Sequence, residues 1–504
     1  MMTLLLQTSV LDINYVAIWP MIILSISGIA VLLFGIAKDP VHRDMSMIGI
    51  VGFVLAGVAT GRLWLPVKTV GQIRAFSNMV IIDHFSLYFF FIFIIIGLLT
   101  LLISASFLEA ERLPVGEFYS LVMFAVVGMM LMAAAGHLVM IFLGLEIASI
   151  STYALAGYRR NDLRSNESAI KYFVLGSAAT AFLLYGMALI YGATGSAELE
   201  GIRTAIIDNV NAATKQPVHT ELLFLGAAMM LVGFSFKVSA VPFHLWTPDV
   251  YEGAPSSVTA FMATASKAAA FAAFLRVFVF CFVPGYGQGL HSAWTTSLET
   301  IAILTMIAGN IAALTQHNFK RMLAYSSIAH AGYALVGLIA DDWQAVAFYL
   351  LTYSITNIGA FGLITYLAGR GDRETEIDDL AGLGFNNLGV SIAMLILLLS
   401  LAGIPLTAGF MGKFIVFKAA WQKGFHVAVI VAVVTSAVSV YYYLRPMVIM
   451  FFRELKVEPK RLPLPTGVLV TVVLSILGTF YLGVMPGRLF QAMENAKVSF
   501  VQSR

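Results

Sequence analysis

The segment Gly233-Phe-Ser-Phe-Lys237-Val-Ser-Ala-Val-Pro242 decides the fold. Its lysine ends an apolar run of about twenty residues, which is long enough to cross a bilayer as a helix. The proline one turn later breaks that helix, because proline removes a backbone donor and clashes with the preceding turn. Inside hydrocarbon, such a break persists only where protein or water satisfies the freed backbone groups. The segment therefore predicts a membrane protein with polar groups at its midplane.

The composition extends this interpretation to the whole chain. Its 504 residues are 60% hydrophobic and 11% charged, far from the composition of a soluble globular protein. Apolar runs separated by charges, glycines and prolines predict an all-α polytopic membrane protein with about fourteen transmembrane helices in the lipid bilayer. We expect these helices near residues 15–37, 45–64, 80–107, 118–135, 137–158, 168–193, 221–241 with a continuation to about 252, 256–282, 298–316, 321–340, 342–368, 389–422, 425–452 and 465–485.

A second interrupted helix is expected at Gly403-Ile-Pro405-Leu-Thr-Ala-Gly409. The two breaks fall in the seventh and twelfth predicted helices, five apart, as in transporters built from inverted repeats. We expect two inverted five-helix repeats, each with a broken helix. The expected parts are helices 1–3 within 1–117, a first repeat at 118–282, a second at 298–451, and a final helix with a short tail at 465–504.

The basic residues of the loops predict the orientation. Lysine and arginine are more frequent in the loops that follow odd-numbered helices, for example at Arg159, Arg160, Lys320 and Arg321. By the positive-inside rule, both chain ends are then expected outside the cytoplasm. The net charge is only +3 and no basic run is present, so the sequence does not suggest binding to nucleic acid.

Three lysines and one glutamate stand within apolar runs: Glu146, Lys237, Lys267 and Lys413. A charge at the bilayer midplane costs from a few to more than ten kcal/mol, depending on how it is estimated, unless it is paired or hydrated. Lys267 lies roughly 16 Å from the start of its run, beyond the reach of its side chain to the interface. Because such charges usually mark ion or proton pathways, we expect these four residues to carry the function.

Each of these residues also has a purely structural interpretation. Lys237 could belong to a static ion pair, Lys267 could bond to helix-end carbonyls, and Lys413 could extend toward the nearer interface. Glu146 could join helices through hydroxyl groups that follow it in its own helix. In the functional interpretation, Glu146 pairs with a lysine of another helix and tunes its proton affinity. The hydroxyl residues in question are Ser149, Ser151 and Thr152.

Histidines are natural proton relays, because their unperturbed pKa is near neutrality. His244 follows the first break, and His330 lies within a predicted helix beside tyrosine and serine. A satisfied core residue is the alternative for both. Two further groups have ordinary explanations: Asp83 is expected to cap a helix, and Lys171 is expected to pair with Glu167 four residues earlier.

The chain lacks the sequence signatures of an energy source. It contains no phosphate-binding loop, no Rossmann-type glycine pattern and no convincing haem-type histidine pair. Its single cysteine, Cys281, excludes disulfides within the chain and clusters held by several of its own cysteines. We therefore expect no cofactor and no metal in this chain, and an energy source elsewhere.

Long motifs give the chain a family resemblance. They are Pro242-Phe-His-Leu-Trp-Thr-Pro-Asp-Val-Tyr-Glu-Gly-Ala-Pro255, Asn318-Phe-Lys-Arg-Met-Leu-Ala-Tyr-Ser-Ser-Ile-Ala-His-Ala-Gly-Tyr333 and Glu376-Ile-Asp-Asp-Leu-Ala-Gly-Leu-Gly384. In these segments the chain resembles the antiporter-like, proton-translocating membrane subunits of respiratory complex I. It is most similar to the N type, because it has Val250-Tyr-Glu-Gly253, a lysine at position 413 and no long lateral helix after the last span.

The resemblance implies a function and a set of roles. Glu146 would pair with Lys237, Lys267 would be the central relay and Lys413 the terminal proton site, with His244 and His330 between them. Protons would move through these groups and water, driven by quinone reduction in other subunits. NAD, FMN, iron–sulfur clusters and quinone would belong to those subunits. The expected partners are M-type and small K/J-type membrane subunits, and the expected location is the bacterial inner membrane.

Two other functional classes remain open at this stage. A Na⁺/H⁺ antiporter subunit of a multisubunit secondary transporter shares the fold and the lysine–glutamate set, although Val250-Tyr-Glu-Gly253 and Lys413 argue against it. An inert scaffold of the membrane arm is the third class. It has no need to bear the cost of four buried ionisable groups.

Overall fold

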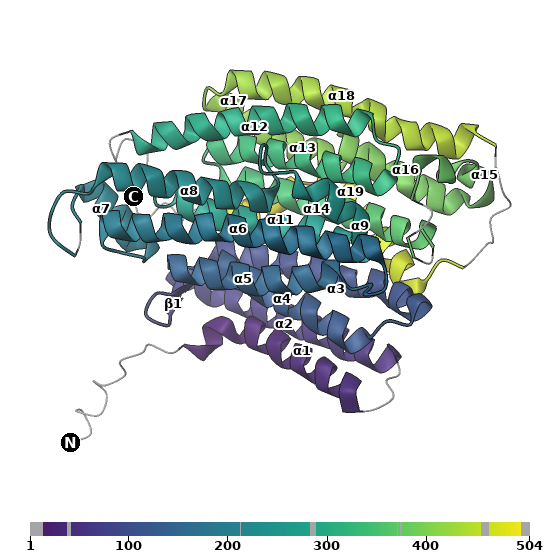
Figure 1. The fold of residues 1–504 in the computed structure, drawn as a ribbon, viewed down its shortest axis with the longest axis horizontal. Helices are drawn as coiled ribbons and strands as arrows, with labels where there is room; N and C mark the ends of the chain where they lie inside the picture. The colour runs from purple at the N-terminus through teal and green to yellow at the C-terminus, as the bar shows by residue number, and fades with distance from the viewer. Residues whose placement is uncertain are drawn as a thin grey trace.

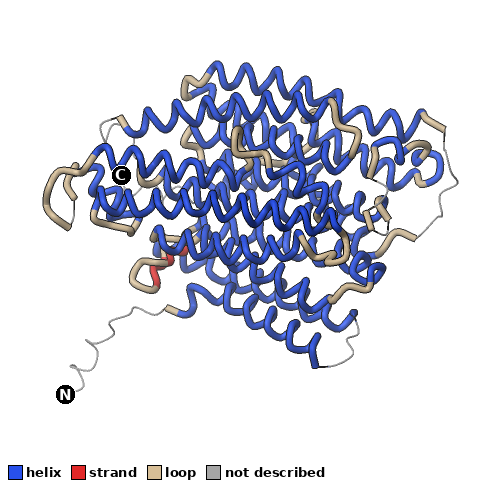
Figure 2. The backbone as a smooth tube through the Cα atoms, in the orientation of Figure 1, coloured by secondary structure: helices blue, strands red, loops and turns tan. Residues whose placement is uncertain are grey.

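The chain forms a bundle of long helices that lie side by side across the molecule (Figure 1). The computed structural model describes residues 14–37, 42–211, 213–282, 289–369, 371–372, 375–454 and 463–494. Within these ranges, the only strands form a short antiparallel hairpin of β1 (Ile73–Ala75) and β2 (Val80–Ile82), drawn in red in Figure 2. The all-α polytopic class predicted from the sequence is confirmed.

Thirteen helical segments in the described ranges are long and apolar enough to cross a membrane. They are α1 (Trp19–Ala37), α2 (His42–Val70), α3 (His84–Glu111), α4 (Val115–Ala133), α5 (Leu138–Ala156), α6 (Leu163–Thr194), α8 (Thr220–Val238), the span Ser256–Val279, α12 (Leu290–Leu314), α13 (Phe319–Ile339), α14 (Trp343–Leu367), α18 (His426–Phe452) and α19 (Thr466–Val484). The remaining predicted span consists of two shorter helices, α16 (Leu388–Ala402) and α17 (Ala408–Gln422).

The span Ser256–Val279 is not a regular α-helix. It contains α10 (Ser256–Phe261), a π-helical turn η2 (Met262–Ser266), α11 (Lys267–Phe274) and a second π-helical turn η3 (Leu275–Val279). Such single π-turns inside α-helices are frequent at functional sites. The short connecting helices are η1 (Tyr15–Ile18), α7 (Leu199–Asp208), α9 (Trp246–Gly253), η4 (Ile377–Leu380), α15 (Leu383–Asn386) and α20 (Gly487–Glu494).

Both predicted helix breaks are present. Helix α8 ends at Val238 and α16 ends at Ala402, and their cap residues, Ser239 and Gly403, have left-handed backbone angles, with φ of 65° and 91°. Glycine adopts this conformation without strain, which accounts for Gly403. The chain resumes as α9 after the first break and as α17 after the second. The residues around each proline thus end one half-helix and start another, as the sequence predicted.

The structure corrects two predicted boundaries. Residues 80–82 form strand β2, and the third long helix starts only at His84, because Asp83 and Ser86 form a reciprocal cap at its first turn. Helix α12 starts at Leu290, well before the predicted 298. Its polar first turns remain helical because their hydroxyls bond back to the helix carbonyls, as Thr295 does to His291 and Ser297 to Ala293.

The centre of the bundle is formed by three spans. In the most apolar 18 residues of Ser256–Val279 and of α13, 94% of the residues are buried, and the corresponding share in α14 is 89%. Helices α1, α2, α6, α12, α18 and α19 are far less buried and expose apolar side chains. This arrangement places the lysine of α11 and the histidine of α13 at the centre of the molecule.

The predicted repeats and the orientation stay predictions. The two broken spans are where the repeats require them, but the exact units 118–282 and 298–451 are not tested by this architecture. Residues 1–13 and 495–504, which include both chain ends and most of the predicted tail, lie outside the described ranges.

Candidate functional site

Lys267 lies at the centre of the polar interior. It is the first residue of α11, directly after the π-helical turn η2, and its side chain is 3% exposed. Its Nζ donates to the carbonyl oxygen of Ser327 at 2.8 Å and to Ser327 Oγ at 2.6 Å. Ser327 lies in the middle of α13, so the contacted carbonyl is not at a helix end. The lysine thus lies where the interruption in its own helix meets α13.

Hydroxyl and amide groups continue the network away from Lys267. Tyr353 of α14 donates its hydroxyl to Ser327 Oγ at 2.8 Å, and Asn357 donates to the Tyr353 hydroxyl at 3.0 Å. All three residues are buried. Each hydroxyl can accept one proton and donate another. This part of the interior can therefore pass a proton between neighbouring groups without moving a charged side chain far.

His330 lies one turn beyond Ser327 on α13 and is 4% exposed. Its Nδ1 shares a hydrogen bond of 2.6 Å with the hydroxyl of Tyr349, and its Nε2 shares one of 3.1 Å with the hydroxyl of Tyr443. Tyr443 also shares a hydrogen bond with Ser326. Both ring nitrogens are therefore partnered. This geometry is compatible with a relay and also with the satisfied core residue considered from the sequence.

Lys413 binds the end of the first half of its own broken span. Its Nζ donates to the carbonyl oxygens of Leu401 and Ala402, in the last turn of α16, at 3.0 and 2.9 Å. It also donates to Ser436 Oγ at 2.9 Å, and it lies 5.1 Å from the centre of the Tyr333 ring. The side chain is 4% exposed. In this structure Lys413 does not extend to the interface.

Lys237 lies in the last turn of α8 and is half-buried. Its Nζ donates to Ser149 Oγ at 2.7 Å and to the Tyr153 hydroxyl at 3.3 Å, both on α5. Glu146 lies one turn before Ser149 on the same helix. Among the residues that the structure describes, no ion pair within 4.0 Å joins Lys237 to Glu146. The Glu146 carboxylate is therefore near the Lys237 amine, but the direct hydrogen bond to that amine is made by Ser149.

The two broken spans share one electrostatic feature. In each, a lysine is placed at the C-terminal end of the first half-helix, where unpaired carbonyls carry partial negative charge, but only the Lys413 amine bonds to such carbonyls, since the Lys237 amine bonds to α5. Lys237 belongs to the end of α8 itself, whereas Lys413 reaches back from α17 to the end of α16.

His244 lies in the first break, between α8 and α9, and is half-buried. Its Nδ1 atom is buried and has no hydrogen-bond partner in the described structure. Among the described residues, Lys237 and Lys267 bond to other partners and not to His244, so its role as a relay stays a prediction.

The two residues with ordinary explanations behave as expected and also make unexpected contacts. Asp83 caps α3, and its carboxylate also binds buried Arg276 at 2.7 Å. Lys171 pairs with Glu167 and additionally with Asp249, each at 2.7 Å. Among the described residues, no group of three or more histidine, cysteine, aspartate or glutamate side chains is arranged to hold a metal ion.

Comparisons with known proteins place the chain in a family. Residues 135–439 match the family described as NADH:quinone oxidoreductase/Mrp antiporter, TM. NADH-quinone oxidoreductase subunit N of Trichlorobacter lovleyi is 43% identical over 491 residues, covering 96% of this chain and 97% of that protein. A chain of respiratory complex I from Thermus thermophilus superposes with a TM-score of 0.76 at 35% identity, covering 94% of this chain and 98% of that one.

A more distant neighbour shares the fold alone. A chain of the Mrp complex from Dietzia superposes with a TM-score of 0.80 at 19% identity, covering 97% of this chain and 98% of that one. The stronger sequence identity lies with the curated N subunits, over nearly the full length of the chain. This chain belongs to the NADH-quinone oxidoreductase subunit N family of antiporter-like membrane proteins.

Proposed function

We propose that this chain is a proton-translocating membrane-arm unit of NADH–quinone oxidoreductase. In this proposal, protons cross the midplane through Glu146, Lys237, Lys267 and Lys413, with His330 and His244 and water between them. The energy comes from quinone reduction in other subunits, so the chain acts as the non-redox part of a translocase. The family membership and the buried polar interior support the proposal.

The observation that carries it is the contact between Lys267 and Ser327. A buried amine bonded to a hydroxyl, which in turn accepts from Tyr353, is a group that can exchange protons within an apolar core. The interior also contains His330 and two more lysines with polar partners. Such groups are costly in a membrane protein and are usually retained for ion or proton movement.

The remaining features of the assembly are part of the same proposal. Its partners are the M-type and small K/J-type membrane subunits, and NAD, FMN, iron–sulfur clusters and quinone belong to other subunits. The chain lies in the bacterial inner membrane. The face with Arg159, Arg160, Lys320 and Arg321 is then cytoplasmic by the positive-inside rule, and both chain ends are periplasmic.

The alternative is a Na⁺/H⁺ antiporter subunit. Its support is the shared fold with the Mrp complex at 19% identity, and fold alone does not determine function. The identity to N subunits and Lys413 favour the translocase. Copurification decides between them: native membranes should give this chain together with NADH-dependent quinone reduction. Recovery in a complex without redox centres, with Na⁺-resistance activity, would overturn the proposal.

The mechanism is tested by Lys267→Ala in the assembled complex, reconstituted in vesicles. The expected result is fewer protons pumped per electron, because the central amine is lost. The matched control is Lys423→Ala, which removes an exposed lysine at the end of α17 and should leave the ratio unchanged. If the assembled Lys267→Ala complex pumped an unchanged number of protons per electron, Lys267 would not be part of the relay.

A further inference from the structure

The amine of Lys413 is bonded to neutral oxygens. It lies within 3.0 Å of the carbonyl oxygens of Leu401 and Ala402 and of the hydroxyl of Ser436. In the part of the chain that the structure describes, no carboxylate lies within 4.0 Å of this amine. Dipoles therefore take the place of a counterion, and dipoles arranged in this way attract any small cation.

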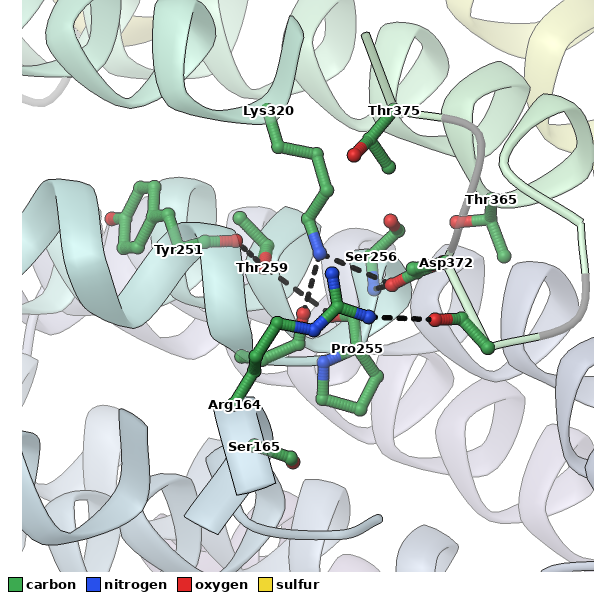
Figure 3. Close-up of polar contacts among 12 residues, drawn as sticks. Arg164, Ser165, Tyr251, Pro255, Ser256, Thr259, Lys320, Thr365, Asp372 and Thr375 are labelled. Atoms are coloured by element: carbon green, nitrogen blue, oxygen red, sulfur yellow. Dashed lines mark hydrogen bonds and ion pairs between the residues drawn. The ribbon is translucent and has the colours of Figure 1, made fainter. Parts of the chain in front are cut away.

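A second buried lysine, Lys320, has a full counterion. Its amine lies 3.1 Å from the carboxylate of Asp372 and donates to the carbonyl oxygen of Ala254 at 2.6 Å. Figure 3 shows the Lys320 side chain directed toward Asp372. Lys320, Asp372 and Lys413 are 1%, 4% and 4% exposed, so the depth of burial does not explain the difference. The neutral surroundings are therefore a property of the Lys413 site.

The oxygens around Lys413 include the end of a helix. Backbone N–H groups that follow the break bond to the carbonyls of Leu399 and Ser400, whereas the carbonyls of Leu401 and Ala402 accept from the lysine. The C-terminal end of an α-helix carries a partial charge of roughly −0.5, because its last carbonyls lack helical partners. In ion-coupled transporters, such half-helix ends coordinate Na⁺. The end of α16 therefore has the electrostatics of a cation site.

The site is enclosed by backbone and by one aromatic ring. A Cβ atom on Gly403 would lie 3.2 Å from Lys413 Nζ, so the amine lies against bare backbone at the break. A Cβ atom on Gly409 would overlap the carbonyl of Ser400, so the two half-helices touch through their backbones. The ring centre of Tyr333 lies 5.1 Å from the amine, and the face of such a ring attracts cations. Backbone contacts of this kind keep their positions when the occupant changes.

An ammonium group and a monovalent metal ion can bind the same oxygens. Both carry one positive charge, and an ammonium group is close to K⁺ in size. Carbonyl oxygens replace the hydration shell of K⁺ in channels, and Leu401 and Ala402 present oxygens of this kind to Lys413. Because a tethered group competes with free ions at a high effective concentration, the lysine keeps the site filled.

We propose that Lys413 is the built-in occupant of a monovalent-cation site at the second helix break, and that it makes this chain select H⁺ by excluding Na⁺ and K⁺. The existence of the site rests on the contacts described above. The selection of H⁺ rests on the proposed function, since it requires that the Lys413 amine exchanges protons. The only bond that forms or breaks is N–H, as the amine takes up or releases one proton.

The site can be tested by emptying it. Lys413→Ala removes the side chain beyond Cβ, and propylammonium replaces the atoms that are lost. The melting temperature of the assembled, detergent-solubilised complex is measured in K⁺, Na⁺ or propylammonium chloride, against choline chloride at equal ionic strength. Choline is too large for the space that the lysine leaves. A ligand that binds only the folded protein raises its stability as the ligand concentration rises.

Lys413→Met is the matched control, because its apolar side chain fills the same space. We expect the small cations to raise the melting temperature of Lys413→Ala in a saturable way, K⁺ and propylammonium more than Na⁺, because they are closer in size to the lysine amine. Wild type and Lys413→Met should melt as they do in choline. If Lys413→Ala responds to the cations no more than Lys413→Met does, the proposed cation site is wrong.

Proton pumping separates this inference from the proposed function. In reconstituted Lys413→Ala complex, propylammonium brings an exchangeable proton and should restore part of the ratio of protons to electrons, whereas K⁺ should not. If the cations stabilise the variant but propylammonium restores no pumping, the cation site stands. Proton exchange at Lys413, which belongs to the proposed function, is then contradicted.

A second variant covers the case in which Lys413→Ala does not assemble. Lys413→Ser adds a hydroxyl oxygen to the emptied site and is measured in the same way. If neither variant assembles, the cells are grown with propylammonium or, as the uncharged control, with propanol. Recovery of NADH–quinone activity with propylammonium alone supports the site, and recovery with both compounds or with neither overturns it.

Discussion

Lys413 Nζ lies 2.9 Å from the carbonyl oxygen of Ala402, so the second half of a broken span caps the first half. A buried carbonyl at a helix end needs a partner, and the lysine provides it. If Lys413 releases or moves its proton, the end of α16 loses part of that cap. The proton state of this residue is therefore coupled to the geometry of the break.

Replacing Lys413 with methionine tests this coupling. The side chain keeps nearly the same length, but the carbonyls of Leu401 and Ala402 lose their donor, at a cost of about 1–3 kcal/mol for each group left unpaired. We expect both lower thermal stability of the complex and fewer protons pumped per electron. Lys418→Met is the matched control, because Lys418 is exposed on the same helix. If Lys413→Met pumped as many protons per electron as wild type, Lys413 would not be needed for proton transfer.

The contact between Lys237 and Ser149 gives a second prediction. Hydrogen bonds to charged groups contribute roughly 1.5–3 kcal/mol, so Ser149→Ala should weaken the hold on the Lys237 amine and slow proton pumping. Ser151→Ala is the control, because the Ser151 hydroxyl bonds only to the carbonyl of Ile147 in its own helix. The pumping rate of reconstituted complex is the measurement.

The same contact predicts how Glu146 acts. If the carboxylate influences Lys237 through Ser149, the effects of Glu146→Gln and Ser149→Ala on pumping should not add in the double variant, since contacting groups in one network couple. Simple addition of the two effects would show that Glu146 acts on Lys237 independently of Ser149.

The long helices and both breaks were predictable because each depends on local sequence. Apolar runs set the spans, and Pro242 and Gly403 set the breaks. The lysines could be recognised as unusual because charge within an apolar run is costly. Hairpin β1–β2 was missed because Val80–Ile82 is apolar and directly precedes an apolar helix.

The partners of the lysines were not predictable. Ser327, Tyr353 and Asn357 are ordinary polar residues in apolar helices, and only the packing of α11, α13 and α14 brings them to Lys267. Lys320 was counted as a loop charge, because its partner Asp372 is 52 residues away in the chain. Contacts of this kind depend on tertiary packing, which no local pattern encodes.

Variants of the tyrosines that bond to His330 can show whether this histidine is a proton relay or a structural core residue. Tyr443→Phe removes the hydroxyl that meets Nε2 but preserves the ring. If His330 transfers protons, pumping should fall while the stability of the complex changes by only about 1 kcal/mol, the usual net value of a hydrogen bond. If only stability falls and the ratio of protons to electrons is intact, His330 is a core residue. Tyr441→Phe, at an exposed position on the same helix, is the control.

The buried cluster of Asp372, Lys320 and Arg159 leads to a prediction about stability. Asp372→Asn leaves Lys320 and Arg159 buried without their shared carboxylate, and breaking a buried pair in this way costs about 3–5 kcal/mol. Lys320→Met should cost less, because Arg159 still pairs with Asp372. The double variant should be more stable than Asp372→Asn, since it removes Lys320, the cation left without a carboxylate, whereas Arg159 still pairs with Glu111 at 3.0 Å. The melting temperature of the assembled, detergent-solubilised complex is the measurement.

The pH dependence of this effect follows from the lowered pKa of Asp372. A carboxylate with a lowered pKa in the folded state contributes stability above its unfolded pKa, about 3.9, and loses that contribution as the pH falls through the folded value. The melting-temperature difference between wild type and Asp372→Asn should therefore be the same at pH 5 and pH 8. If the difference shrank between pH 8 and pH 5, Asp372 would be taking up a proton in that range, and the cluster would be a titrating site instead of a fixed ion pair.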